Sequence, residues 1–301
     1  MEAILMAVII FDFGGTSVKY GVWAQNELGQ NGSFKTPATW EEMQKQLQAT
    51  FTQLKSTVSD VQGVALSLPG VVDNEKGEIR GLSAIPYIHN FPIKAAFSEL
   101  FDHLPIAMEN DANCAALAEL WLGSANDVNS AMVIALGTGV GGSVIMNHQL
   151  VRGRNLVGGE FGFMQMTPEE TWSKIGTVVT AVQRYNDQSG EAAINGTELF
   201  DRADAGDELA QKEVEKFYHY NAVGLYNLIS SFNPDRIILA GGVSARPDLA
   251  DILIHRVTNL LKWAGLSEPT VDIQTSRFSN DANLIGAVKN FKDCYSDIDL
   301  K

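Results

Sequence analysis

An asparagine and an aspartate stand side by side in the segment ENDANCAALAE, residues 109–119, just before a run of small apolar residues. An ionised carboxylate at the end of a strand, such as that of Asp111, can accept the proton of an alcohol as the alcohol attacks a phosphorus atom. Asn110 can donate to a sugar hydroxyl and accept from one. The alternative, that Asp111 or Asn110 only caps the helix that follows, fits this segment equally well.

Three glycine-rich turns, DFGGTSVK, LGTGVGG and AGGVS, each follow an apolar segment that reads as a strand. Glycine lets a ligand approach the backbone, so that N–H groups can point at phosphate oxygens. The first turn adds Asp12, Thr16 and Lys19, which are suited to organising a metal and a phosphate, and the second adds Thr138. Each turn alone could be an ordinary hairpin, but three of them favour a phosphate site that is not of the Walker type.

The segment GGEFGFM, residues 158–164, holds Glu160 between glycines, where its carboxylate could accept hydrogen bonds from sugar hydroxyls. The alternative is an acidic residue that is simply solvated in a glycine loop. The histidines show no metal-binding spacing, and a role on the surface or in the core fits each of them better; they are His89, His103, His148, His219 and His255.

The elements that would position these residues follow from hydrophobic periodicity and turn signals. Strands are predicted at residues 4–10 and 18–23, around the first glycine turn, and again on both sides of the turn that contains Gly137. The likeness of these two strand–turn–strand units indicates a duplicated fold. Further predictions are a helix that buries Met43, Leu47, Phe51 and Leu54, strands ending near residues 69 and 110, a mostly helical region over residues 171–231, and a last helix over 282–292.

A hydrophobic content of 45% indicates a folded chain. Its length of 301 residues exceeds the usual size of one domain and indicates two cores. A formal net charge of −14 has the wrong sign for a nucleic-acid or anionic membrane partner. Only two cysteines occur, in no Cys-x-x-Cys pair, which predicts a cytoplasmic protein. The apolar start is too short to span a bilayer and reads as a buried strand.

The ordered series DFGGTSVK, LSLPGVVD, ENDANCAALAE, LGTGVGG, GGEFGFM and NPDRIILAGGVS resembles the ROK family of sugar kinases over nearly the whole chain. The resemblance implies an α/β chain with the two-domain actin/hexokinase-like ATPase fold, related to ribonuclease H, with the ligand cleft between the domains. We expect an N-terminal α/β domain at residues 1–112 plus 283–301 and a C-terminal α/β domain at residues 113–282. The resemblance also implies a homodimer.

Carried over by position, the resemblance assigns catalysis to Asp111 as the general base, with ATP and Mg²⁺ as cofactors. Asp12 would act on Mg²⁺, directly or through water. The sugar-binding residues would be Gly70, Asn110, Asp111, Glu160 and Phe163. The nucleotide would be bound by Asp12, Gly14, Gly15, Thr16, Lys19, Gly137, Thr138, Gly139, Gly241 and Gly242, with the last two beside the adenosine.

The chain also departs from the common pattern of the family. Phe163 stands where many members have a histidine, and the cysteine motif that binds a structural zinc is missing, so we expect no zinc site. Phenylalanine removes a hydrogen bond and adds a stacking surface. The chain most resembles the zinc-less β-glucoside kinases of the family, and this resemblance implies phosphorylation of the 6-hydroxyl of a hexose or β-glucoside such as cellobiose. The alternatives are an N-acetylmannosamine kinase, a glucokinase, a sugar-responsive regulator and a catalytically silent sugar-binding protein.

Overall fold

The computed structural model describes residues 6–266, 270–278 and 281–298, so the first two residues of the strand predicted at 4–10 lie outside the described residues. The chain divides into two compact units, and each is described by itself. Unit 1 comprises Met1–Gly123, Gly153–Val157 and Asn280–Lys301, and unit 2 comprises Ser124–Arg152 and Gly158–Ser279. The domain limits expected from the sequence stay a prediction.

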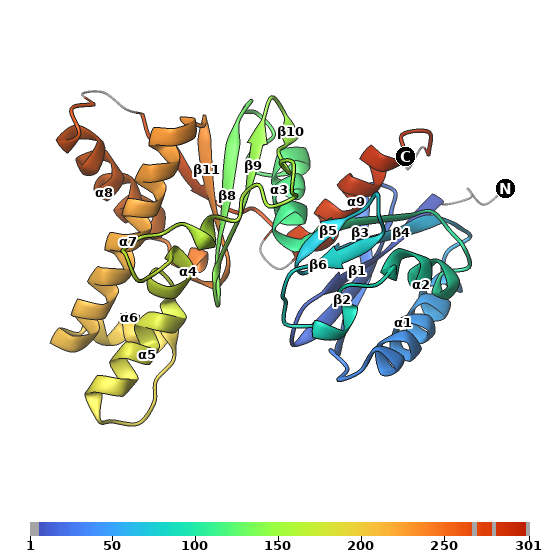
Figure 1. The fold of residues 1–301 in the computed structure, drawn as a ribbon, viewed down its shortest axis with the longest axis horizontal. Helices are drawn as coiled ribbons and strands as arrows, with labels where there is room; N and C mark the ends of the chain where they lie inside the picture. The colour runs from blue at the N-terminus through green and yellow to red at the C-terminus, as the bar shows by residue number, and fades with distance from the viewer. Residues whose placement is uncertain (1–5, 267–269, 279–280, 299–301) are drawn as a thin grey trace. The chain divides into compact units, whose positions relative to one another are not determined.

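Unit 1 is built on a five-stranded sheet with the order β3-β2-β1-β4-β7 in the described residues (Figure 1). β1 pairs antiparallel with β2 and parallel with β4, and β4 pairs parallel with β7. The elements of the unit are β1 (Met6–Phe13), β2 (Ser17–Ala24), β3 (Glu27–Lys35), α1 (Trp40–Lys55), β4 (Asp60–Leu68), β5 (Val71–Asp73), β6 (Glu78–Arg80), the 3₁₀ helix η1 (Pro86–Ile88), α2 (Ile93–Leu100), β7 (Ile106–Asn110), α3 (Asp111–Leu122) and α9 (Ala282–Cys294).

The central strand β1 is buried from Ala7 to Phe13 because helices cover both faces of the sheet. Alternate side chains of β1 join one core with the apolar stripe of α1 and with α2. That stripe consists of the predicted residues Met43, Leu47, Phe51 and Leu54, which are all buried. α9 packs against α3 and against β4 and β7 on the other face.

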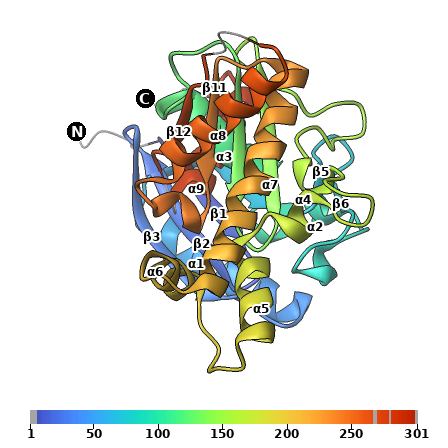
Figure 2. The same ribbon diagram turned by 90° about the vertical axis from the view of Figure 1, so that its left-hand side faces the viewer.

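Unit 2 contains a second five-stranded sheet, with the order β10-β9-β8-β11-β12 in the described residues, and its own core (Figure 2). The long helix α7 packs beside α8, α6 and α5. The elements are β8 (Ala131–Leu136), β9 (Val140–Met146), β10 (Gln149–Leu150), the 3₁₀ helix η2 (Phe161–Phe163), α4 (Trp172–Ile175), α5 (Val178–Ser189), α6 (Gly196–Asp204), α7 (Glu208–Phe232), β11 (Arg236–Ala240), the 3₁₀ helix η3 (Gly242–Ala245), α8 (Leu249–Trp263) and β12 (Ile273–Thr275).

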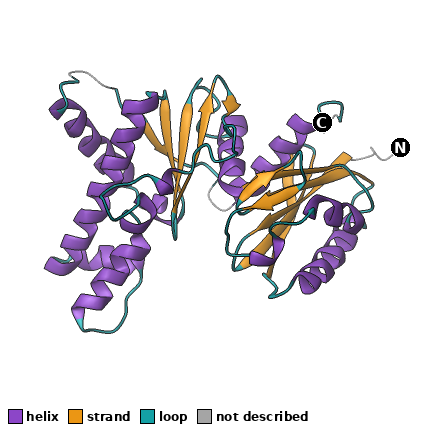
Figure 3. Cartoon of the chain, viewed as in Figure 1, coloured by secondary structure: helices purple, strands orange, loops and turns teal. Residues whose placement is uncertain are grey.

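The two sheets have the same topology, which supports the predicted duplication. In each sheet the first three strands of the unit form an antiparallel meander, and the fourth and fifth strands add parallel to the first (Figure 3). The mostly helical region predicted over residues 171–231 is confirmed as α4 to α7. No helix among residues 6–266, 270–278 and 281–298 is long and apolar enough to cross a membrane.

Candidate active site

Asp12 lies near the end of β1 and is only 6% exposed. Its Oδ1 accepts hydrogen bonds from Ser67 Oγ at 2.7 Å and from Asn283 Nδ2 at 3.1 Å. Burial raises the pKa of the Asp12 carboxyl, an effect that these two hydrogen bonds and the nearby Lys19 ammonium oppose. Lys19 is the cross-strand neighbour of Asp12 in the β1–β2 pair. Asp12 is therefore a buried carboxyl group that hydrogen-bond donors hold in place.

This setting is compatible with Mg²⁺, which commonly takes one or two protein carboxylates and fills its remaining positions with water and substrate phosphates. No group of three or more His, Cys, Asp or Glu side chains that could hold a metal ion occurs in the part of the chain that the structure describes. The donor set at Asp12 is therefore a single carboxylate with hydroxyl and amide neighbours. Such a set suits a hydrated magnesium ion shared with a nucleotide.

The first glycine turn, Gly14 to Thr16, connects β1 and β2 and is fastened to its surroundings by backbone hydrogen bonds. Gly14 N donates to Ser17 O at 3.1 Å, and Thr36 N donates to Thr16 O at 3.0 Å. A Cβ at Gly15 would lie 2.5 Å from the Ala84 Cβ, so the site has no room for a side chain. Neither glycine has a positive φ, so close packing explains them better than left-handed backbone.

Asn110, and not Asp111, is the N-cap of α3. Asn110 Oδ1 accepts from Asn113 N at 3.1 Å, which satisfies one of the free N–H groups at the start of the helix. Asn110 Nδ2 donates to Gly70 O at 3.0 Å and to Asp111 Oδ1 at 2.9 Å. The capping alternative left open for this segment is thus settled in favour of Asn110.

Asp111 is the first residue of α3, where the helix dipole favours a negative charge. Its Oδ1 accepts from Ala112 N at 2.8 Å as well as from the Asn110 amide, and its side chain is half-buried. Both bonds fix the carboxylate at the carboxyl end of β7. Asn110 makes the N-cap hydrogen bond, and Asp111 Oδ1 accepts from a second free N–H group of the first turn.

The parallel strands of unit 1 bring these residues to one edge of the sheet. The register pairs Asp12 with Ser67, and Ser67 with Glu109, so the carboxyl ends of β1, β4 and β7 lie side by side. Gly70 follows β4 with a φ of +94°, a backbone that disfavours any residue with a side chain. Ligands of open α/β sheets bind outside such strand ends. Asp12, Gly70, Asn110 and Asp111 therefore belong to one candidate site.

Two residues beside this site were missed by the sequence reasoning, Ser83 and His89. Ser83 Oγ and His89 Nε2 are hydrogen bonded at 2.6 Å, and a Cβ at Gly70 would lie 2.8 Å from His89 Cε1. Burial lowers the pKa of His89 below its ordinary value. The spacing of the histidines in the sequence could not reveal a role for His89, because its hydrogen-bond partner is a serine hydroxyl and not a second metal-binding residue.

The second and third glycine turns meet in unit 2. Gly137 to Gly139 connect β8 and β9, and Gly241 and Gly242 follow β11, which pairs parallel with β8. Gly241 has a φ of +92°, and a Cβ there would lie 2.3 Å from Leu136 O. Thr138 is exposed at the tip of its turn. The carboxyl ends of β8 and β11 thus form a second edge that carries predicted nucleotide-binding residues.

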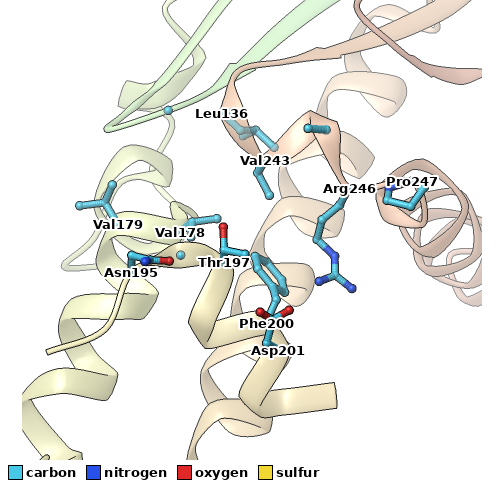
Figure 4. Close-up of a pocket in the computed structure, with 14 residues that line it drawn as sticks. Leu136, Val178, Val179, Asn195, Thr197, Phe200, Asp201, Val243, Arg246 and Pro247 are labelled. Atoms are coloured by element: carbon cyan, nitrogen blue, oxygen red, sulfur yellow. The ribbon is translucent and has the colours of Figure 1, made fainter. Parts of the chain in front are cut away.

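A pocket of about 790 Å³ opens at this edge and is lined by Gly137 and Gly242 (Figure 4). Its apolar walls include Val178, Val243 and Pro247, and its polar groups come from α6 and η3. The guanidinium of Arg246 lies 4.3 Å above the ring of Phe200 and makes two hydrogen bonds to Asp248. The sequence reasoning did not identify several residues that line the pocket: Thr197, Phe200 and Asp201 of α6, the α6 N-cap Asn195, and Arg246 directly after η3.

Glu160 is the N-cap of the 3₁₀ helix η2 of unit 2, and Phe163 is the last residue of that helix. Burial raises the pKa of the Glu160 carboxyl above its ordinary value. Phe163, three residues on, is 76% exposed, and its N–H donates to Glu160 O at 3.2 Å. A partly desolvated carboxylate next to an uncovered aromatic ring suits a ligand with both hydroxyls and an apolar group.

The chain then closes a short loop where the family's cysteine motif would begin. Trp172 N donates to Met164 O at 2.8 Å, and Gln165 pairs with Thr171 in an isolated bridge. The Trp172 side chain is completely buried, and its Nε1 donates to Asn221 Oδ1 at 3.1 Å. Hydrogen bonds and one buried indole hold this loop against α7.

The sequence and the fold of this chain resemble those of known proteins. The ROK family model matches residues 8–293. A β-glucoside kinase of Klebsiella pneumoniae is 34% identical over 299 residues, which are 96% of this chain and 97% of that protein. The crystal structure of a ROK family protein from Streptococcus pneumoniae TIGR4 in complex with sucrose superposes with a TM-score of 0.88 at 32% identity, over 97% of this chain and 100% of that one.

A ROK family glucokinase from Streptomyces griseus, in complex with glucose and AMPPNP, has a TM-score of 0.75 at 26% identity, and the match covers 94% of this chain and 97% of that one. These likenesses confirm the predicted actin/hexokinase-like fold. They also make this protein a carbohydrate kinase, as the ordered motifs predicted. We conclude that the chain belongs to the ROK family.

Proposed function

We propose that this kinase transfers the γ-phosphate of ATP to the 6-hydroxyl of a β-glucoside, with Asp111 as the general base. The observation that carries the proposal is the division of roles at the start of α3, where Asn110 caps the helix and Asp111 is left at the edge that also holds Asp12. Asp111 Oδ1 accepts two hydrogen bonds, from Ala112 N and Asn110 Nδ2, which orient the carboxylate. A positioned carboxylate is what proton abstraction from an alcohol requires.

The nucleotide would be bound from both units. Asp12 would hold Mg²⁺, directly or through water, and the bound ion would neutralise charge on the transferring phosphoryl group. Gly14, Gly15, Thr16 and Lys19 would face the phosphates from unit 1, and Gly137 to Gly139 would do so from unit 2. The pocket beside Gly242 would take the adenosine, because its apolar walls suit a flat base.

Asn110, Gly70 and Glu160 would bind hydroxyls of the sugar. The exposed ring of Phe163 favours a substrate with a substituent beyond the glucose ring over a free hexose, since a ring in this place can stack but cannot hydrogen bond. The relatives of this chain include β-glucoside kinases, a glucokinase and N-acetyl-D-glucosamine kinases. A ligand cleft between the two domains, a homodimer and a cytoplasmic location are further predictions that go with this proposal.

The test is Asp111→Asn, assayed for ATP consumption with cellobiose, an aryl β-glucoside, glucose and N-acetylmannosamine. The asparagine Oδ1 can still accept from Ala112 N and Asn110 Nδ2, so the variant should fold normally while kcat falls by roughly 10² to 10⁴. Asp251→Asn is the matched control, because Asp251 is an exposed aspartate in the first turn of α8. Near-full activity of Asp111→Asn would exclude the general-base role.

A further inference from the structure

The loop of residues 81–85 connects β6 to η1, and two contacts with the candidate site lie along this part of the chain, one made by Arg80 directly before the loop and one by Ala84 within it. At the first contact, a Cβ on Gly70 would lie 3.1 Å from Arg80 O, and Gly70 O is the acceptor of the Asn110 amide. At the second contact, Ala84 packs against Gly15 of the first glycine turn. This 81–85 loop therefore runs from the predicted sugar-binding residues to the predicted phosphate-binding turn.

Hydrogen bonds of the Ser83 side chain hold the second half of the 81–85 loop. Ser83 Oγ is bonded to His89 Nε2 at 2.6 Å and accepts from Ile85 N at 3.1 Å. Asn90 N donates to Ile79 O at 2.9 Å, which ties the far side of η1 to β6. This half of the loop is thus a pre-ordered part of unit 1, and binding a ligand on it would lose little conformational entropy.

Leu82 sits in the middle of this loop with 97% of its side chain exposed, whereas Ile85 is buried. One exposed leucine by itself requires no explanation. Here, however, the exposed side chain stands within two residues of groups that touch Gly70 and Gly15, and Ala84 and Pro86 beside it are exposed as well. The loop offers an apolar surface next to a site whose other members are polar.

Resting on the proposed function, we propose that Leu82 is a specificity-determining residue that contacts the aglycone of a β-glucoside. In the proposed site, amide, carboxylate and hydroxyl groups would form hydrogen bonds with the hydroxyls of the phosphorylated ring. The apolar side chain of Leu82 cannot form such hydrogen bonds. The apolar part of an aryl β-glucoside is the aglycone, and covering Leu82 with it would remove apolar area from water on both sides. Unit 2 offers a second exposed apolar group beside a predicted sugar-binding residue, Phe163 next to Glu160.

The test compares Leu82→Asn with the wild-type chain on two substrates, an aryl β-glucoside and free glucose. We expect kcat/KM for the aryl β-glucoside to fall by about tenfold and kcat/KM for glucose to stay within about twofold, because only the first substrate has an aglycone. Leu82→Met keeps an apolar side chain and should retain the selectivity of the wild type. Leu266→Asn is the matched control, since Leu266 is an exposed leucine beyond the end of α8, and it should change neither value.

Each outcome decides the question. A selective loss for the aryl β-glucoside in Leu82→Asn alone supports the contact with the aglycone. An equal fall for both substrates, or no change in an active enzyme, overturns the assignment of Leu82 while the kinase proposal stands. If the wild-type chain phosphorylates glucose but no β-glucoside, the proposed substrate class fails, and the role of Leu82 is overturned with it.

Discussion

Gly286→Ala tests whether the contact between α3 and α9 positions the candidate site. Gly286 is buried in α9, and a Cβ added to it would lie 1.6 Å from Cys114 O and 2.3 Å from the Cys114 carbonyl carbon of α3. Both atoms are backbone, so no side-chain rotation can relieve the overlap. Since an ordinary contact begins at 3.4 Å, the two helices would have to separate by about 2 Å.

Helix propensity predicts that this substitution raises the free energy of unfolding, whereas packing predicts that it lowers it. Alanine in a helix interior is favoured over glycine by about 1 kcal/mol, whereas overpacking a core costs about 1–3 kcal/mol and sometimes more. The overlap with backbone places Gly286→Ala at or above the upper end of that range. We therefore expect a net destabilisation of about 2 kcal/mol or more.

The substitution should also lower activity, because α3 begins at Asp111 and α9 carries Asn283, whose amide donates to Asp12. Urea unfolding followed by circular dichroism measures the stability, and kcat/KM measures the second effect. Gly29→Ala is the control, since nothing lies within 4 Å of its added Cβ and its φ is not positive. An unchanged or higher unfolding midpoint for Gly286→Ala would refute the packing argument.

Two further predictions concern unit 2. Burial raises the pKa of Glu160 in the folded chain above its value in the unfolded chain. Between these two pKa values the folded chain binds more protons than the unfolded chain, so the free energy of unfolding falls as pH rises through that window. Glu160→Gln should therefore unfold at higher urea than the wild type near neutral pH, and this gain should vanish well below pH 4.5; a gain that does not change with pH contradicts the prediction. Arg246→Lys loses the two guanidinium hydrogen bonds to Asp248 and the contact with the Phe200 ring. KM for ATP should therefore rise by about tenfold, while KM for the sugar stays unchanged. A rise in KM for the sugar with an unchanged KM for ATP would contradict the proposal that this pocket binds the nucleotide.

Strands that are continuous apolar runs had the clearest hydrophobic patterns. β1 and β8 are continuous apolar runs and were found, and the helix over Met43 to Leu54 was found from its spacing. β3 was missed, because it reads ELGQNGSFK and alternates between exposed and half-buried residues at the edge of the sheet. β5, β6 and β12 were missed as well, since three residues are too few for a periodic signal.

The glycines show that the reason given for a predicted position can be incomplete. Positive φ explains Gly70 and Gly241, but Gly14, Gly15, Gly137, Gly139 and Gly242 do not have it. Gly15 lacks a side chain because Ala84 occupies the space, and that neighbour lies about seventy residues further along the chain. A single sequence contains no pattern that announces such a contact, so the 81–85 loop was absent from the predicted site.

The polar residues that line the pocket could not be predicted from the sequence for the same physical reason. Asn195 caps α6 by accepting from Glu198 N at 3.1 Å, and this capping box is readable in the sequence as an ordinary helix start. Only the packing of α6 against α7, and of Phe200 against Arg246, places that helix start at the carboxyl ends of β8 and β11. Local signals predict which backbone groups are satisfied, whereas tertiary packing decides which helix end faces a ligand.

The predicted residues at the two sheet edges share one property, which is that each lies within a few positions of the end of a buried strand, whereas Glu160 and Phe163 do not. Parallel pairing brings the ends of β1, β4 and β7 together in unit 1 and the ends of β8 and β11 together in unit 2. A sequence that specifies the strands thereby also specifies the two edges, because register fixes which residues become neighbours. Asp111 joins its edge as the first residue after β7, directly beside Asn110, whose side chain makes the N-cap hydrogen bond of the helix that follows.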